Sequence, residues 1–237
     1  IRTENGRKVR AMFVPANDEH ILMAADYSQI ELRVIAALAG DEAMISAFKN
    51  GEDIHRATAA KVFEVAPEEV TREQRSNAKT VNFGIVYGVS AFGLSQQTDM
   101  SRKEAKAAID GYFRTYPGIK EYMDKQVAVA REKGYVETIT GRRRYLKDID
   151  SRNAVVRGHS ERNAVNAPIQ GSAADIIKLA MIELDRAMRD ANMKSKMLLQ
   201  VHDELVFDAR IEELEALKSL VIEKMEAAVS LAVPMVA

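Results

Sequence analysis

The stretch that decides the fold lies between His20 and Gly40 and reads HILMAADYSQIELRVIAALAG. Its first seven residues form a short apolar run that ends at Asp26, which is typical of a buried strand. The rest repeats apolar residues at helical spacing, with Ser28 and Glu31 at the spacing of a capping box and Gly40 as a natural stop. We therefore expect a strand followed at once by a helix, with a carboxylate where the strand ends.

Helical spacing continues over residues 41–131, where glycine and proline divide it into helices of about 10 to 16 residues. A hairpin is expected next. Residues 135–139 and 142–146 read as two strands, and Thr140-Gly141 supplies the turn between them. The middle of the chain is thus predicted to be helical with one hairpin.

A long helical stretch begins near Ser151, and Pro168 and Gly171 are expected to break or bend it. An amphipathic helix is expected over residues 211–228. The run at residues 233–237 reads as the start of a further strand.

A second hairpin is predicted from two apolar runs, residues 197–201 and 205–207, which His202-Asp203-Glu204 joins. Tight hairpin turns favour Asn-Gly or Asp-Gly, whereas this turn has no glycine and two adjacent carboxylates. A strand, a large helical insertion, a hairpin and a helix together indicate an α+β fold with an antiparallel sheet.

The composition is that of an ordinary globular protein, with 237 residues, 47% hydrophobic, 29% charged and a net charge of −1. The absence of cysteine excludes disulfides, thiolate nucleophiles and Cys-type zinc or iron–sulfur sites, and it is compatible with a reducing cytosol. The longest apolar runs are far shorter than the roughly 18 residues that a membrane span requires. No membrane partner is therefore expected.

The near-zero net charge is a cancellation of local charges. Seven basic residues face three acidic ones between Arg142 and Arg162, whereas eight acidic residues face three basic ones from Asp203 to the end. The basic stretch, with amide side chains nearby, could grip a phosphate backbone. A solvated helix face is the alternative.

The first candidate for chemistry is a set of carboxylates. Asp26 ends the first strand, and Asp203 and Glu204 lie in the turn of the second hairpin. Singly, such residues are more often caps or turn residues. At one edge of a small sheet, however, they could hold two Mg²⁺ ions about 4 Å apart, an arrangement that serves phosphoryl transfer.

The second candidate is a helix that begins with a capping box of Thr71 and Gln74. Two cations and then two aromatic residues follow on one face at four-residue spacing: Arg75, Lys79, Phe83 and Tyr87. This order suits a ligand with a polyphosphate at one end and a planar base at the other. The alternative is a solvated pair of cations and a core pair of aromatics. His55, near the start of another helix, could donate to a phosphate, although a lone histidine is more often structural.

Three segments, in order, resemble motifs A, B and C of the family A DNA polymerases. They are residues 25–33 (ADYSQIELR), 75–88 (RSNAKTVNFGIVYG) and 200–204 (QVHDE), with residues 166–171 (NAPIQG) between the second and the third. The chain is identified on these segments as a member of that family.

The resemblance implies a right-hand polymerase fold, with a palm at residues 1–40 and 156–237 and helical fingers at residues 41–155. It implies template-directed addition of dNTPs to a primer 3′-OH with two Mg²⁺ ions, in DNA replication or repair. The family's thumb, exonuclease domains and last palm strand are expected to lie outside this chain, in a longer monomeric protein of the bacterial cytoplasm that associates with the nucleoid.

The resemblance also implies roles for particular residues. Asp26 and Asp203 would bind the metal ions, and Glu204 and Lys79 would be further catalytic groups. Nucleotide contacts are implied for Gln29, Glu31, His55, Arg75, Lys79, Phe83 and Tyr87, with Glu31 as the steric gate against a ribose 2′-hydroxyl. DNA contacts are implied for Arg33, Ser90, Arg162, Asn166, Gln170 and His202.

Two other classes of function stay open at the level of sequence. One is a fragment that binds nucleotide or DNA without turnover, and the other is a two-metal nuclease. Primer extension with Mg²⁺ separates the first from a polymerase, and release of nucleotides from DNA without dNTPs would identify the second.

Overall fold

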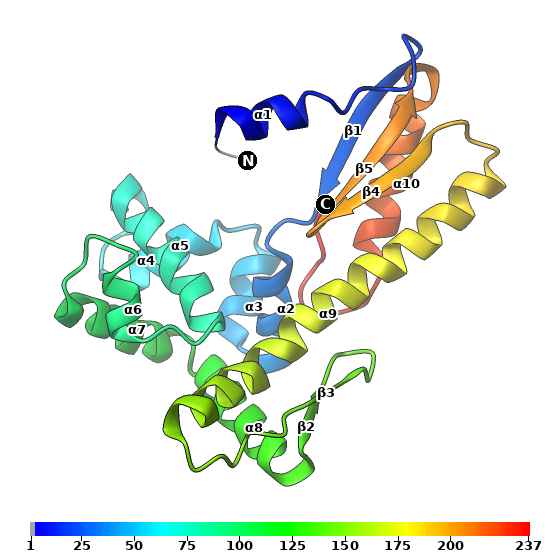
Figure 1. Cartoon of the computed structure of the whole chain (residues 1–237). Coiled ribbons are helices and arrows are strands. Elements are labelled where there is room, and N and C mark those ends of the chain that lie inside the picture. Colours follow the sequence, from blue (N-terminus) through cyan, green and yellow to red (C-terminus); the bar gives the residue numbers. More distant parts are fainter. Residues whose placement is uncertain (1–2) are drawn as a thin grey trace. The chain divides into compact units, whose positions relative to one another are not determined.

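The computed structural model describes residues 3–237 and forms two compact units. Unit 1 contains the chain up to Ser28 together with Ile176–Ser230 and Met235–Ala237, and unit 2 contains Gln29–Asp175 and Leu231–Pro234. Helices and antiparallel sheets are both present, as predicted (Figure 1).

The elements divide between the units as follows. Unit 1 contains α1 (Glu4–Arg10), β1 (His20–Asp26), β4 (Lys196–Val201), β5 (Glu204–Arg210), η2 (Ile211–Glu213) and α10 (Leu214–Glu226). Unit 2 contains α2 (Ile30–Ala39), α3 (Glu42–Lys49), α4 (Ile54–Val62), η1 (Pro67–Glu69), α5 (Arg72–Val86), α6 (Ala91–Ser95), α7 (Arg102–Thr115), α8 (Pro117–Lys133), β2 (Tyr135–Glu137) and β3 (Arg143–Tyr145). Helix α9 (Ala154–Asp190) contributes residues to both.

Unit 1 is built on a three-stranded antiparallel sheet in the order β1-β5-β4 (Figure 1). Alternate residues of β5, namely Leu205, Phe207 and Ala209, are fully buried, as a strand with one covered face requires. Helix α10 packs against β5 and buries its own apolar stripe. The second predicted hairpin is confirmed as β4 and β5.

The turn of this hairpin uses a left-handed backbone without glycine. His202 has φ +58° and Asp203 follows it, so two residues connect the strands. Positive φ at such a position is what a tight hairpin turn demands. The side chain of Gln200 donates to the His202 carbonyl at 2.9 Å, which helps to hold this conformation.

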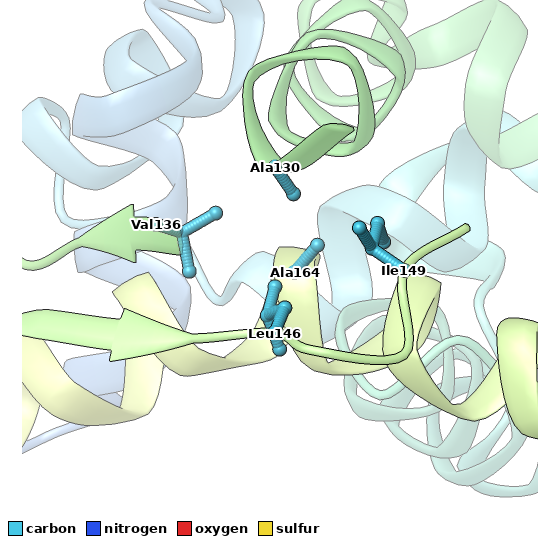
Figure 2. Packing of buried hydrophobic residues seen from close by; sticks show 5 residues of the cluster. All are labelled: Ala130, Val136, Leu146, Ile149 and Ala164. Carbon is cyan, nitrogen blue, oxygen red and sulfur yellow. The ribbon is translucent and has the colours of Figure 1, made fainter. Parts of the chain in front are cut away.

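Unit 2 is mainly helical, and α4 packs against both α5 and α7. The predicted hairpin at residues 135–146 is confirmed as β2 and β3. Its core side is shown in Figure 2, where Val136 and Leu146 of the hairpin segment lie with Ile149, Ala130 of α8 and Ala164 of α9. This cluster joins the hairpin to the two helices through apolar contacts.

The capping box predicted for α2 is wrong. The helix begins at Ile30, and its N-cap is Gln29, which adopts a left-handed conformation with φ 55° and makes no side-chain capping hydrogen bond. Glu31 is instead the acceptor of a hydrogen bond from the Tyr87 hydroxyl. The Gly40 stop is confirmed, because Gly40 is the left-handed C-cap.

A break or a bend was predicted at Pro168 and Gly171, and the break does not occur, since α9 runs through both residues. Proline removes one hydrogen bond from a helix. Here the residues around it are buried, with Val165 4% and Ile169 0% exposed, so packing keeps the chain helical.

The strand predicted at residues 233–237 does not form. Pro234 cannot donate to a ladder, and its carbonyl accepts from the Arg33 guanidinium at 2.7 Å. The carbonyl of Val236 accepts a backbone hydrogen bond from the Ser28 N–H at 2.8 Å.

The boundaries between the two compact units differ from the boundaries predicted between palm and fingers. Residues 29–40 and 156–175 belong to unit 2, with the helices.

Candidate functional site

The carboxylates of the sheet edge are brought together within unit 1. Antiparallel pairing of β1 with β5 sets Asp26 opposite Glu204. The Tyr27 N–H donates to the carbonyl of Asp203 at 3.2 Å, which fixes the turn beside the end of β1. Asp26 therefore shares one edge of the sheet with Asp203 and Glu204, which are distant from it in the sequence.

The electrostatics of this edge favour a cation. Burial, and then the charges of Asp203 and Glu204, raise the pKa of Asp26 above its ordinary value. Mutual repulsion of this kind is relieved by a bound positive ion. Within residues 3–237, no three His, Asp or Glu side chains already surround a common cation position. Carboxylate oxygens such as those of Asp26 and Asp203 are ligands that Mg²⁺ accepts in proteins.

The predicted ridge of α5 is present in unit 2, and the Thr71–Gln74 capping box that starts the helix is confirmed at 3.1 and 2.9 Å. Arg75 at its first turn donates to Asp53 at 2.7 Å. Burial would raise the pKa of Asp53, but the hydrogen bonds from Arg75 and from backbone N–H groups lower it overall. Arg75 is thus held in place by a carboxylate that stays ionised.

A cavity of about 540 Å³ opens beside the ridge. It brings together four residues that the sequence assigned to nucleotide or DNA: Lys79, Phe83, Tyr87 and Arg162. Lys79 is exposed, so its ammonium is available to an anion.

Two further nucleotide candidates adjoin the ridge. His55 lies with its ring centroid 5.8 Å from that of Phe83. Glu31 accepts a 2.5 Å hydrogen bond from the Tyr87 hydroxyl, which orients its carboxylate. Cations, an aromatic face, an imidazole and an oriented carboxylate are thereby gathered around α5.

A second cavity of about 520 Å³ lies between the β2–β3 hairpin and α9 in unit 2. It is lined by amides and cations, with Asn166 and Gln170 among the residues predicted to touch DNA: Thr138, Arg142, Arg143, Arg144, Asn163, Asn166, Ala167, Gln170 and Gly171. The Oδ1 atom of Asn166 is buried, and within the described part of the chain it has no hydrogen-bond partner. Such a lining suits a phosphate-bearing ligand.

Other candidates have structural contacts in this molecule. Arg33 is only 7% exposed, donates to the Pro234 carbonyl and stacks over Phe48 at 4.6 Å. Ser90 caps α6 by accepting from Gly93. Gln29 and His202 are the two candidates with left-handed backbones. Contacts of these residues with nucleotide or DNA stay predictions.

Sequence reasoning missed the polar residues that surround His55. Asn82 and Thr58 are both fully buried, and the side chain of Asn82 contacts Nδ1 of His55 at 2.9 Å. The sequence did contain a signal for Asn82. It is a polar residue on the same face of α5 as Ala78 and Ile85, and that face is buried.

The comparisons with known proteins agree with the resemblance. The family model for DNA polymerase family A matches residues 1–237. DNA polymerase I of Lactococcus lactis subsp. cremoris is 55% identical over 236 residues, and DNA polymerase I of Geobacillus stearothermophilus is 54% identical over 235 residues. Each alignment covers 99% of this chain and 27% of the relative.

A solved structure is similar as well. It is described as the POL domain of Pol1 from M. smegmatis in complex with DNA primer-template and dNTP. It is 49% identical, with a TM-score of 0.92, and the match covers 99% of this chain and 41% of that one.

The fold is similar to that of the solved POL domain, with a TM-score of 0.92. The chain belongs to DNA polymerase family A. It spans about a quarter of the length of the curated relatives it matches. In the described residues, no helix is both long and apolar enough to cross a bilayer.

Proposed function

We propose that this chain is the catalytic part of a DNA-directed DNA polymerase, with residues 1–40 and 156–237 as palm and residues 41–155 as fingers. The observation that carries the proposal is the β1–β5 pairing, which sets Asp26 beside Glu204 and the Asp203 turn. The similar POL domain, described in complex with primer-template DNA and dNTP, supports the same substrates here.

Asp26 and Asp203 would hold Mg²⁺, whose fit rests on the carboxylate oxygens and on the raised pKa of Asp26. When bound, two such ions would activate the attacking primer 3′-oxygen and stabilise the charge on the leaving pyrophosphate. Glu204, paired with Asp26 in the sheet, would keep that edge acidic near the primer terminus.

The residues of unit 2 would bind and orient the nucleotide. Arg75 and Lys79 supply fixed and mobile cations for the triphosphate, and Phe83 supplies a face for the base. Holding the α-phosphate in line for attack supplies a large part of the rate in such reactions. Glu31, held by Tyr87, would exclude a ribose 2′-hydroxyl.

The test is primer extension with Mg²⁺ by the full-length gene product that contains this chain. Asp203→Asn removes a metal-binding charge while keeping the size of the side chain, so we expect incorporation to fall at least about a thousandfold. Asp110→Asn is the matched control, because Asp110 is an exposed carboxylate paired with Lys106 on α7, and it should extend normally.

Two results would contradict the proposal. Binding of DNA and dNTP without any incorporation by the unmodified protein would favour a binding module. Release of nucleotides from DNA in the absence of dNTPs would favour a nuclease.

A further inference from the structure

Behind the nucleotide ridge, unit 2 contains a chain of four buried polar side chains. His55 and Thr58 come from α4, Asn82 from α5, and Tyr116 from the end of α7. His55 is 3% exposed and the other three are 0% exposed. The links are 2.9 Å from Asn82 to His55 Nδ1, 3.1 Å from Thr58 to Asn82, and 3.1 Å from Tyr116 to Thr58.

The proton positions in this chain follow from its members. Thr58 Oγ1 has one proton, which its hydroxyl offers to Asn82 Oδ1 or to the Ile54 carbonyl, so the Tyr116 hydroxyl must be the donor toward Thr58. With its Oδ1 toward Thr58, Asn82 turns its NH₂ group toward His55. A donor at that place requires an unprotonated Nδ1, and the proton of the neutral imidazole is then on Nε2.

The charged groups around His55 keep the ring neutral. The pKa of His55 is lowered to about 4, chiefly by burial and also by the charges of Arg75 and Lys79, while the charge of Asp53 acts in the opposite direction. In the described residues, no hydrogen bond uses Nε2, which leaves this N–H for a ligand beside Arg75, Lys79 and Phe83.

We propose that Asn82 is a positioning residue, which, backed by Thr58 and Tyr116, fixes the neutral tautomer of His55 so that Nε2–H donates to a phosphate oxygen of the incoming nucleotide. The arrangement is useful because a neutral donor selects phosphate by direction while adding no positive charge to a site that already has two cations. The part that concerns the nucleotide rests on the proposed function; the tautomer does not.

The tautomer is tested first, by ¹⁵N NMR of the histidine rings in the full-length gene product, with His55→Gln to assign the signal. We expect Nδ1 of His55 to resonate as an unprotonated nitrogen and Nε2 as a protonated one at neutral pH. A protonated Nδ1 would overturn the inference, because Asn82 would then be an acceptor. This measurement requires no catalytic activity, so it stands even if the polymerase proposal fails.

The functional part is tested with Asn82→Asp. A carboxylate facing Nδ1 would draw a proton there and raise the pKa of His55. Below the new pKa both nitrogens carry protons and Nε2 still donates; above it Nε2 has no proton. We therefore expect the KM for dNTP to be close to normal at pH 6 and about tenfold higher at pH 8.5, with kcat changed less. An equal loss at all pH values would indicate a merely structural role and overturn the proposal.

A second variant guards against misfolding of Asn82→Asp. Tyr116→Phe removes the donor that fixes Thr58, and it should raise the KM for dNTP by about threefold and mix the two tautomers in the NMR spectrum. Tyr122→Phe is the matched control, because the Tyr122 hydroxyl is buried without a hydrogen-bond partner in the described structure, and it should change neither. If Tyr116→Phe behaved like this control, the positioning role of the chain would be excluded.

Discussion

At the residue scale, Glu31 does not have the capping role that its spacing predicted, but its carboxylate lies where the predicted steric gate requires an oriented side chain. Its spacing from Ser28 suggested a helix cap, yet its carboxylate is held by the Tyr87 hydroxyl, near the cavity beside α5. A carboxylate held at that place can exclude a ribose 2′-hydroxyl by occupying the space that the hydroxyl needs.

We expect Glu31→Ala to reduce the preference for dNTP over rNTP by at least about tenfold, measured as the ratio of kcat/KM values in primer extension. Tyr87→Phe removes only the hydrogen bond and leaves the carboxylate in place, so it should retain most of the preference. Unchanged sugar selectivity in Glu31→Ala would exclude the gate.

His55 gives a prediction for stability. Its pKa is about 4 in the fold against 6.5 ordinarily, so between these values the unfolded chain binds a proton that the folded one does not. The contribution of the neutral ring is fully present above pH 6.5 and is lost as the pH falls toward 4. After allowance for solvent screening, we expect the free energy of unfolding to decrease by about 2 kcal/mol over this window.

Urea unfolding at a series of pH values measures this decrease, and His55→Gln should have a flatter profile. Taking the difference between the two proteins cancels the other three histidines, which both contain. Asp53 does not interfere, because its lowered pKa acts only below its ordinary value of 3.8. Parallel profiles would show that His55 accepts a proton in the fold as readily as in the unfolded chain.

At the scale of elements, the β2–β3 hairpin segment approaches α9 closely at Gly171. A Cβ added to Gly171 would lie 2.5 Å from Cγ2 of Thr138. We therefore expect Gly171→Ala to destabilise the protein by about 1–3 kcal/mol in urea unfolding, although alanine is the better helix former.

Thr138→Ser tests the cause, because it removes the methyl group and keeps the oxygen that accepts from the Arg142 N–H at 3.1 Å. The double variant should recover most of the loss. Gly158→Ala on the same helix is the control, since its nearest neighbour atom is 3.6 Å away, and it should be neutral or slightly stabilising. No recovery in the double variant would mean that the methyl contact is not the cause.

Elements were predictable where local rules and packing agree. The Thr71–Gln74 box, the Gly40 stop and both hairpins follow from short-range chemistry and are present. The continuation of α9 through Pro168 was not predictable from local rules, because the burial of its neighbours outweighs the local preference of proline, and such burial depends on contacts distant in sequence. The acidic edge could be proposed from Asp26 and Asp203, but only the β1–β5 register brings them together. The polar character of buried Asn82 could be noticed on α5, but its contact with His55 was not predictable, since α4 and α5 are brought together only by packing.

At the scale of the whole molecule, the net charge of −1 is the sum of stretches with opposite charge. The acidic excess lies from Asp203 onward, at and after the turn proposed to bind metal. In the basic stretch between Arg142 and Arg162, Arg142, Arg143 and Arg144 line the amide-bearing cavity of unit 2. The proposed function needs these charges apart, because acidic and basic groups mixed on one surface would weaken the binding of both Mg²⁺ and a polyanion.

This separation predicts how DNA binding depends on salt. Each phosphate contact made by a cation releases counterions and contributes about 0.9 to the slope of log K against log salt concentration. Arg144 is exposed in the 520 Å³ cavity, so Arg144→Gln should weaken primer-template binding at low salt and reduce the slope by about 0.9, the contribution of one phosphate contact.

Lys106→Gln is the control, because Lys106 is also a surface cation but is paired with Asp110 on α7. The slope measured for this variant should be unchanged. Fluorescence anisotropy over a salt series measures both. An equal change in the two variants would mean that DNA responds to total charge, and the cavity between the hairpin and α9 would then have no special part in binding the backbone.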